Sequence, residues 1–261
     1  GHGGSGKTTF LEAALLETKV ISRLGKVEDG NTVSDYDKME KEKGYSISTS
    51  IVPVEYEKVK INFRDTPGFF DFIGEVEGAL RAVEAAAILV DASSGVQVGT
   101  EKAWNLCKKE GMPRFFIINK TDKENVDVSA VVEELKEKFG TSVATLDDRD
   151  ALSEAIAETD EELMEKFFDV GEFTDEEFAQ GLINGIGIAP VLDCSAVKGE
   201  KIAEVLDAIV KYVPTATGKE DETADGETVK CDPAGKMSAF VFKTIADPFL
   251  GKISLAKVIS G

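Results

Sequence analysis

Residues 1–8 read Gly-His-Gly-Gly-Ser-Gly-Lys-Thr, and the prediction of the fold starts from them. They match the pattern G-x-x-x-x-G-K-[ST], in which glycines let the backbone wrap around an anion and present successive N–H groups to it. A helix predicted from Thr8 to Leu16 adds the positive end of its dipole. An ordinary glycine-rich turn before a helix is the alternative, but all eight positions fit the pattern. The residues that we expect to bind phosphate are Gly1, His2, Gly3, Gly4, Ser5, Gly6, Lys7, Thr8 and Thr9.

Two of these side chains predict a nucleoside triphosphate with a magnesium ion. Lys7 can reach the β- and γ-phosphates, and the Thr8 hydroxyl can complete the oxygen shell of Mg²⁺. Farther along, residues 65–68 read Asp-Thr-Pro-Gly. Asp65 can hold the same ion, usually through water, and the Gly68 N–H can meet the γ-phosphate. Taken alone, this second stretch is also good type I or II turn chemistry.

A base-selecting loop is predicted at residues 119–122, which read Asn-Lys-Thr-Asp. Asp122 can accept hydrogen bonds from N1–H and the exocyclic amine of guanine, whereas adenine presents an acceptor at N1 and would leave the carboxylate unpaired. Lys120 can lay its stem over the base, and Asn119 can tie this loop to the phosphate loop. The loop therefore predicts GTP and GDP as ligands.

A second base-side loop is predicted at residues 195–198, Ser-Ala-Val-Lys. There the Ala196 N–H would meet guanine O6, with Ser195 and Val197 beside it. Each of these short strings, taken singly, is compatible with an ordinary surface loop. Their order along the chain, each after a predicted strand, favours a nucleotide site at the carboxyl edge of a parallel sheet.

Short apolar strands alternate with amphipathic helices, and this alternation predicts an α/β fold with a parallel sheet. The strands are predicted at Ile51 to Phe63, Ala86 to Asp91, Arg114 to Ile118 and Ala189 to Asp193, and the helices at Thr8 to Leu16, Gly74 to Glu84 and Val128 to Phe139. Trp104 and Cys107 lie one helical turn apart and are expected to face the core. The longest apolar run, Ala85 to Val90, is far below the roughly 20 residues of a membrane span, so no membrane partner is expected.

The 261 residues carry a formal charge of −19, and 42% of them are apolar, which is a globular composition. Such a charge repels phosphodiester backbones and argues against free-standing nucleic-acid binding through counterion release. Cys107, Cys194 and Cys231 have no metal-site spacing and are typical of reduced thiols in a cytoplasmic protein. Between residues 147 and 177 there are 14 acids against two bases, so the acidity is regional.

This acidic region predicts a small helical insert at about residues 140–185. Capping boxes at Thr159–Glu162 and Thr174–Glu177 are expected to start its helices. Its apolar face is predicted to come from three residues: Leu163, Phe167 and Phe168.

The chain changes in character after residue 213. Residues 214–236 are polar, contain several glycines and prolines and show no periodicity, which is typical of an interdomain linker. Met237 to Lys243 and Lys252 to Ile259 are β-rich and predict a hairpin. The residues expected between the two strands are Asp247, Pro248 and Gly251.

The predicted organisation has three parts: an α/β domain at 1–213 that contains the insert, the linker at 214–236, and the start of a truncated β-barrel domain at 237–261. Gly1 already belongs to the phosphate loop, which normally follows a strand. We therefore expect both ends to be cut from a longer polypeptide.

Together these motifs resemble the translational GTPases, most closely elongation factor G and its paralogues. The matching stretches are G-H-x-x-x-G-K-T-T at the start, residues 42–47, Asp65 to Phe72, Arg81 to Gly95, Met112 to Asp122, the Ser195 loop and residues 246–251. The resemblance implies a Ras-like G domain with an insert and a following β-barrel, GTP or GDP with Mg²⁺, and the ribosome as partner. It also implies that Ser46 stands where the family's switch I threonine binds Mg²⁺; serine keeps the hydroxyl.

Two positions depart from the family pattern. Gly4 replaces an acidic residue of the phosphate loop, which puts any ion supported by that acid in doubt. Phe69 stands where D-T-P-G-H has the histidine that orients the attacking water, and phenylalanine has neither donor nor acceptor. His2 is the chain's single histidine and lies in the phosphate loop, so weak or absent intrinsic hydrolysis is implied, as in elongation factor G-like paralogues.

Several alternatives stay open at this point. The chain can belong to a slow GTPase, to a nucleotide-controlled switch that does not hydrolyse GTP, or to a ribosomal protection or recycling factor. An ATP-using P-loop enzyme would bind ATP as well as GTP. The acidic insert resembles a shortened G′ subdomain, whose helices face a ribosomal stalk protein, but a solvated helical face explains it equally well. Phe69 and Phe70 fit either a hydrophobic gate or plain packing.

Overall fold

The computed structural model describes residues 1–218, 220–223, 225–247 and 249–261. Pro248, expected in the C-terminal turn, lies outside the described residues. The helices are α1 (Lys7–Glu17), α2 (Lys38–Lys43), α3 (Ile73–Leu80), α4 (Val98–Lys109), α5 (Val128–Phe139), α6 (Arg149–Ala157), α7 (Glu161–Val170), α8 (Asp175–Asn184) and α9 (Ile202–Tyr212), with 3₁₀ turns η1 (Phe70–Phe72) and η2 (Ala216–Gly218). The strands are β1 (Ser50–Tyr56), β2 (Val59–Asp65), β3 (Ala86–Asp91), β4 (Arg114–Asn119), β5 (Val143–Thr145), β6 (Ala189–Cys194), β7 (Glu220–Glu222), β8 (Thr228–Lys230), β9 (Ser238–Asp247) and β10 (Gly251–Ser260).

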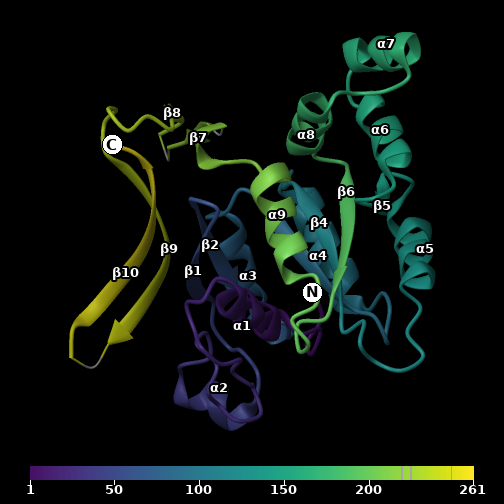
Figure 1. The fold of residues 1–261 in the computed structure, drawn as a ribbon. Coiled ribbons are helices and arrows are strands. Elements are labelled where there is room, and N and C mark those ends of the chain that lie inside the picture. The colour runs from purple at the N-terminus through teal and green to yellow at the C-terminus, as the bar shows by residue number, and fades with distance from the viewer. Residues whose placement is uncertain (219, 224, 248) are drawn as a thin grey trace.

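A parallel sheet with the order β3-β4-β6-β5 forms the centre of the molecule, which confirms the predicted α/β class (Figure 1). Its register pairs Asp91 with Asn119 and Asn119 with Cys194. Three strands therefore end at the same level, and the loops that follow them share one edge of the sheet.

Both faces of this sheet are covered by helices, so its strands are apolar at nearly every position. Leu89 and Ile117 pack toward α1 and α9, whereas Ile88, Phe116 and Ile118 pack toward α3, α4 and α5. On the second face, Trp104 and Cys107 are buried as predicted. The strands are therefore packed between two apolar layers.

The segment Ile51 to Phe63 is two strands rather than one, which corrects the prediction. β1 and β2 pair antiparallel around a turn in which Glu57 and Lys58 have φ values of 46° and 68°. Both turn residues thus adopt the left-handed conformation that favours glycine or asparagine in two-residue hairpins. The turn was missed because neither residue is of that type.

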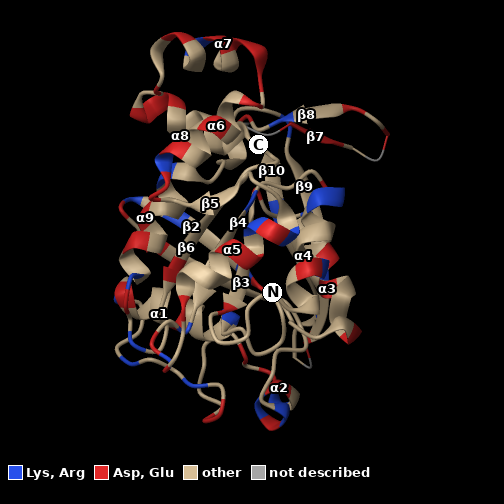
Figure 2. Cartoon of the chain, turned by 90° about the vertical axis from the view of Figure 1, so that its right-hand side faces the viewer, with Lys and Arg blue, Asp and Glu red and all other residues tan. Residues whose placement is uncertain are grey.

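The acidic insert folds as α6, α7 and α8 around its own small core, and Asp and Glu are dense on these helices (Figure 2). The capping box of Thr174 and Glu177 is confirmed, but α7 is capped by Asp160 and not by Thr159. The Asp160 carboxylate accepts from two backbone N–H groups of the first turn. Phe168 is 81% exposed, so its predicted place on the apolar face is wrong. Leu163 and Phe167 pack against the core of the insert as predicted, and Phe167 stacks on Phe173.

The C-terminal hairpin of β9 and β10 is confirmed, and it stands beside β2 and α3 (Figure 1). Arg64 lies over the Phe242 ring, and Arg81 lies over the Phe240 ring, each 4.8 Å from the centroid. The polar stretch at 214–236, predicted as an interdomain linker without periodicity, contains the 3₁₀ turn η2 and the small β7–β8 hairpin. Among the described residues, no helix is long and apolar enough to cross a bilayer.

Candidate functional site

The phosphate loop lies in front of α1, and its shape depends on glycine. Gly4 and Gly6 have φ values of 81° and 89°, and a Cβ on Gly6 would collide with the Asn119 amide. Lys7 Nζ donates to the carbonyls of His2 (3.0 Å) and Gly1 (3.3 Å) across the loop. Burial lowers the pKa of Lys7, partly opposed by the nearby charge of Asp65. The ammonium is therefore held against the carbonyls at the start of the loop.

Gly68 closes this loop from the other side. A Cβ on Gly68 would lie 2.5 Å from Lys7 Nζ and 2.7 Å from the Gly3 Cα. The structure thus brings together Gly3, Lys7 and Gly68, which the sequence analysis assigned to phosphate binding from two separate motifs. Thr9 follows in the first turn of α1.

Oxygen ligands for a metal converge next to Lys7. Thr8 Oγ1 donates to Asp65 Oδ2 at 2.8 Å and lies 3.3 Å from Ser46 Oγ, which donates to Asp35 Oδ1 at 2.7 Å. The structure therefore unites the predicted trio of Thr8, Ser46 and Asp65. It also adds Asp35, a residue that the sequence analysis missed.

The chemistry of this cluster fits Mg²⁺. Asp65 Oδ1 and Asp35 Oδ2 are buried and have no hydrogen-bond partner within the described part of the chain. Two carboxylates and two hydroxyls form an all-oxygen donor set, which Mg²⁺ prefers. Burial raises the pKa of Asp65 to about 6, although the Thr8 hydrogen bond and Lys7 act in the opposite direction. A cation would remove this cost of a buried carboxylate.

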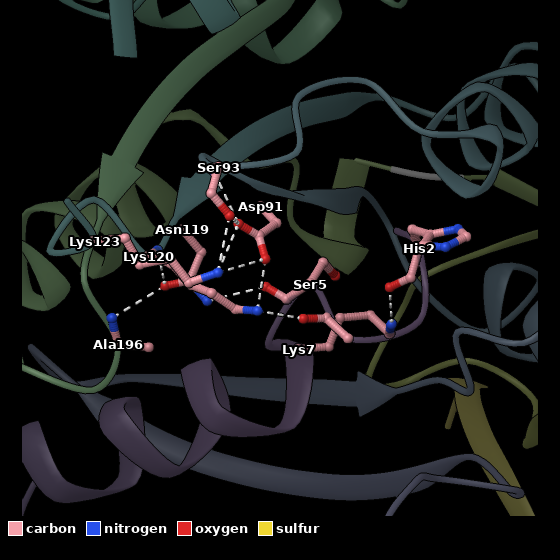
Figure 3. Close-up of polar contacts among 10 residues, drawn as sticks. His2, Ser5, Lys7, Asp91, Ser93, Asn119, Lys120, Lys123 and Ala196 are labelled. Carbon is pink, nitrogen blue, oxygen red and sulfur yellow. Dashed lines mark hydrogen bonds and ion pairs between the residues drawn. The ribbon is translucent and has the colours of Figure 1, made fainter. Parts of the chain in front are cut away.

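The base-side loop is joined to the phosphate loop by Asn119 and Lys120 (Figure 3). Asn119 Nδ2 donates to the Ser5 carbonyl at 3.1 Å, as predicted from the sequence. Lys120 Nζ donates to the Gly4 carbonyl at 2.6 Å and to Asp91 Oδ2 at 2.7 Å. The lysine stem thus spans from the end of β4 to the phosphate loop.

Asp122 faces the Ser195 loop. Its Oδ1 accepts from Ser195 Oγ at 2.5 Å, and Ser195 Oγ also accepts from Lys198 N at 3.3 Å. The Ala196 N–H donates to Asn119 Oδ1 at 3.1 Å, so in this structure the donor expected at guanine O6 is engaged within the protein. Val197 is 58% exposed at the outer side of the loop. Two loops predicted separately therefore form one surface around Asp122.

Two aromatic side chains flank the phosphate loop. Phe69 is 44% exposed, its ring lies 4.7 Å from that of Tyr45, and a Cβ on Gly3 would approach it to 3.2 Å. Phe70 lies edge-on to His2 at 6.2 Å, and the Lys102 ammonium sits 3.6 Å above its ring. Phe69 thus provides an apolar surface where the family pattern has an imidazole.

Buried acids that the sequence analysis missed hold the loops of the site. Glu12 accepts from the N–H groups of Gly25 and Val33, and Glu40 accepts from those of Ile47 and Ser48. Asp91 lies at the end of β3 and receives both Lys120 and Lys123. A polar residue directly after an apolar strand was the available signal for Asp91, because Asn119 stands at the same level of β4.

The comparisons with known proteins agree with this geometry. Residues 1–215 match the family described as elongation factor Tu GTP binding domain. A crystal structure of a protein from Thermus thermophilus matches with a TM-score of 0.84 and 29% identity, covering 100% of this chain and 44% of that chain. The present chain thus spans less than half the length of that protein. It belongs to the elongation factor Tu GTP-binding domain family and is a member of the translational GTPases.

Proposed function

We propose that this chain is the Mg²⁺-dependent, GTP- and GDP-binding module of an elongation factor G-like translation factor, with slow GTP hydrolysis. The observation that carries the proposal is the convergence of four motifs at one edge of the sheet, joined by the bonds of Asn119 and Lys120 to the phosphate loop. The family itself implies GTP or GDP binding. The ion, the rate of hydrolysis and the partners go beyond what the family implies.

The phosphates would be bound by the N–H groups of residues 1–9 and by Lys7. Lys7 would exchange the carbonyls of Gly1 and His2 for phosphate oxygens, which are stronger acceptors because they are charged. The Gly68 N–H would meet the γ-phosphate. Gly68 lies against Lys7 and Gly3. Loss of the γ-phosphate would therefore remove the contact of the Gly68 N–H and release the segment that follows Gly68.

Thr8, Ser46, Asp65 and Asp35 would hold Mg²⁺, directly or through water. When bound, the ion supplies positive charge to the β- and γ-phosphate oxygens. Ser46 lies in the segment expected to act as switch I, and its hydroxyl is within 3.3 Å of Thr8 Oγ1. This contact supports a switch that orders around the triphosphate.

The base would be selected by Asp122, assisted by Lys120, Ser195, Ala196 and Val197. Two acceptor oxygens on one carboxylate complement the N1–H and amine of guanine, and adenine leaves them unmet. The Ser195 hydrogen bond aims the Asp122 carboxylate before the base arrives. For the Ala196 N–H to reach guanine O6, it must be shared with or released by Asn119.

Hydrolysis should be slow because Phe69 offers no atom that can orient water. Its ring beside Tyr45 and Gly3 would instead keep an apolar surface near the terminal phosphate. A switch that holds and releases GTP without cleaving it is the second candidate, and the same observation favours it. The two differ in whether ribosomes stimulate turnover.

The ribosome is proposed as the partner from the family alone, as is a cytoplasmic location. The proposed partner of the acidic insert is a ribosomal stalk protein, and the dense negative charge of its helices supports this proposal (Figure 2). Protection or recycling of ribosomes are alternative roles of the whole protein. The domain limits at 213 and 236 remain predictions, as do the insert limits of about 140–185.

Nucleotide titrations test the proposal directly. With Mg²⁺, the chain should bind GDP and GTP far more tightly than ATP. Asp122→Asn should weaken guanine nucleotides and favour xanthosine nucleotides, because the amide can donate to the xanthine oxygen. Equal affinity for ATP and GTP, or unchanged preference in Asp122→Asn, would refute the site. Single-turnover assays with and without ribosomes then separate the slow enzyme from the pure switch.

A further inference from the structure

Asp91 is a buried carboxylate at the junction of three loops. It ends β3, is 7% exposed and pairs in register with Asn119 of the neighbouring strand. Neither the phosphate loop nor the base-selecting loop contains it. Its position at the strand end nevertheless points it between the two loops (Figure 3).

The carboxylate is oriented by its own loop and receives two lysines. Ser93 donates to Asp91 Oδ1 through its backbone N–H (2.9 Å) and its hydroxyl (2.7 Å). Lys120 Nζ lies 2.7 Å and Lys123 Nζ lies 3.3 Å from Oδ2. Ser93 thus binds Oδ1 and Lys120 binds Oδ2, whereas Lys123 Nζ lies within 3.5 Å of both oxygens and also donates to Ser93 Oγ at 2.9 Å.

Lys120 is held at both sides of its ammonium group. Asp91 Oδ2 and the Gly4 carbonyl both accept from Nζ, and the Lys120 side chain is only 25% exposed. Without the carboxylate, a partly buried ammonium would keep one neutral acceptor in the phosphate loop. An ammonium group with so little compensation is unfavourable when partly buried, so it would move toward water. The aliphatic stem of Lys120 would then leave the position where it can contact the base.

We propose that Asp91 is a positioning residue that holds Lys120 across the nucleotide site and so couples base binding to phosphate binding. The proposal rests on the proposed function and adds to it a residue that need not touch the nucleotide. Lys123, whose side chain is 44% exposed, approaches the same carboxylate from the surface, with its Nζ 3.3 Å from Oδ2.

The charge of Asp91 should be constant across the usual assay range. Burial alone would raise the pKa of Asp91, but the hydrogen bonds from Lys120 and Ser93 outweigh it and lower the pKa to about 2. Its contribution to nucleotide affinity should therefore not change between pH 6 and pH 8, approximately the range in which most assays are run.

Asp91→Asn tests the proposal because it removes the charge and keeps the shape. We expect GDP and GTP to bind about tenfold more weakly, as for the loss of one contact in a coupled network. The preference for guanine over xanthine should stay as in the wild type, since Asp122 is intact. Glu101→Gln is the matched control: it breaks an exposed ion pair with Lys138 and should leave affinity unchanged.

A double-mutant cycle with Lys120→Met separates positioning from a general loss of stability. If Asp91 acts through Lys120, Asp91→Asn should weaken GDP binding no further in the Lys120→Met background. Additive losses, or wild-type affinity in Asp91→Asn, would overturn the proposal. If Asp91→Asn proves too unstable to titrate, Ser93→Ala must show a smaller loss that also vanishes in the Lys120→Met background, and additivity there overturns it equally.

These outcomes are distinct from a failure of the proposed function. That failure would appear in Asp122→Asn or in the wild type, as a missing preference for guanine. A guanine-specific wild type with an additive Asp91–Lys120 cycle would reject the positioning role alone.

Discussion

Lys243 links the C-terminal hairpin to the nucleotide-binding part, as does Lys257, which pairs with Glu84. Lys243 Nζ donates to Ser48 Oγ, to the Thr49 carbonyl at 2.8 Å and to Glu75 Oε2 at 3.0 Å. The Lys243 side chain is 10% exposed and that of Glu75 is 32% exposed. A hydrogen bond to a charged group contributes about 1.5–3 kcal/mol to the free energy of unfolding. Because Glu75 is partly exposed, the bond between Lys243 and Glu75 should contribute toward the lower end of this range.

Lys243→Met keeps the apolar stem and removes the ammonium. We therefore expect the free energy of unfolding to fall by about 2 kcal/mol. For a chain of this size, such a loss lowers Tm by about 5 °C, measured by circular dichroism. Lys252→Met, at an exposed position of the same hairpin, is the control and should shift Tm by less than about 1 °C.

The pH dependence gives a second test of the same contact. Burial would raise the pKa of Glu75, but hydrogen bonds from Thr49 and Lys243 outweigh it and lower the value below 4.5. A lowered carboxyl pKa stabilises the folded state above that pH, and the stabilisation is lost as Glu75 takes up a proton. The gap between wild type and Lys243→Met should thus be full at pH 7 and narrow as the pH falls through the lowered pKa of Glu75. A variant as stable as the wild type at pH 7 would refute the reasoning.

Three further outcomes follow from the site and its surroundings. Phe69→His should raise ribosome-stimulated GTP turnover, by about a hundredfold if the imidazole orients water; an unchanged single-turnover rate would count against the assignment of this position. Because the pKa of Asp65 is raised to about 6 by burial, the Mg²⁺ affinity measured by calorimetry with GDP should drop as the pH falls from 7.5 to 5.5, approximately the interval in which the carboxylate protonates. A flat profile would exclude Asp65 from the ion shell. The Asp207 hydrogen bond raises the pKa of Tyr56 to about 12, so in Asp207→Asn a spectrophotometric titration should show this tyrosine ionising near its ordinary pH, and no movement would contradict the contact.

The sequence was informative where the functional residues of a loop are consecutive in the chain. The phosphate loop combines glycines with a following helix, and Asp65 to Gly68 and the Asn119 loop each combine polar side chains with a preceding strand, so both their conformation and their partners could be predicted. The bond of Asn119 to the phosphate loop is an example, since the strand order alone brings the two loops together.

Contacts formed by single acids at long range could not be predicted. Asp35 and Glu12 look like ordinary surface acids in the sequence, yet each is at most 4% exposed. Their partners come from other loops, and nothing local indicates the pairing. The β1–β2 turn failed for a different reason, because the packing of the hairpin imposes left-handed φ values on Glu57 and Lys58 against their intrinsic preference.

Because of Asn119, we expect the loops of the site to open together. Its Oδ1 accepts from the N–H groups of Lys120 and Ala196, while its Nδ2 donates to the Ser5 carbonyl. The phosphate loop, the base-selecting loop and the Ser195 loop are therefore all hydrogen-bonded to one side-chain amide. None of these loops can move outward without breaking a hydrogen bond of the amide that also positions the other two loops. Deuterium uptake at the Lys120 and Ala196 amides should then occur at the same rate, through one common opening. Dissociation of a ligand would depend on that common opening and not on separate movements of the phosphate side and the base side of the site.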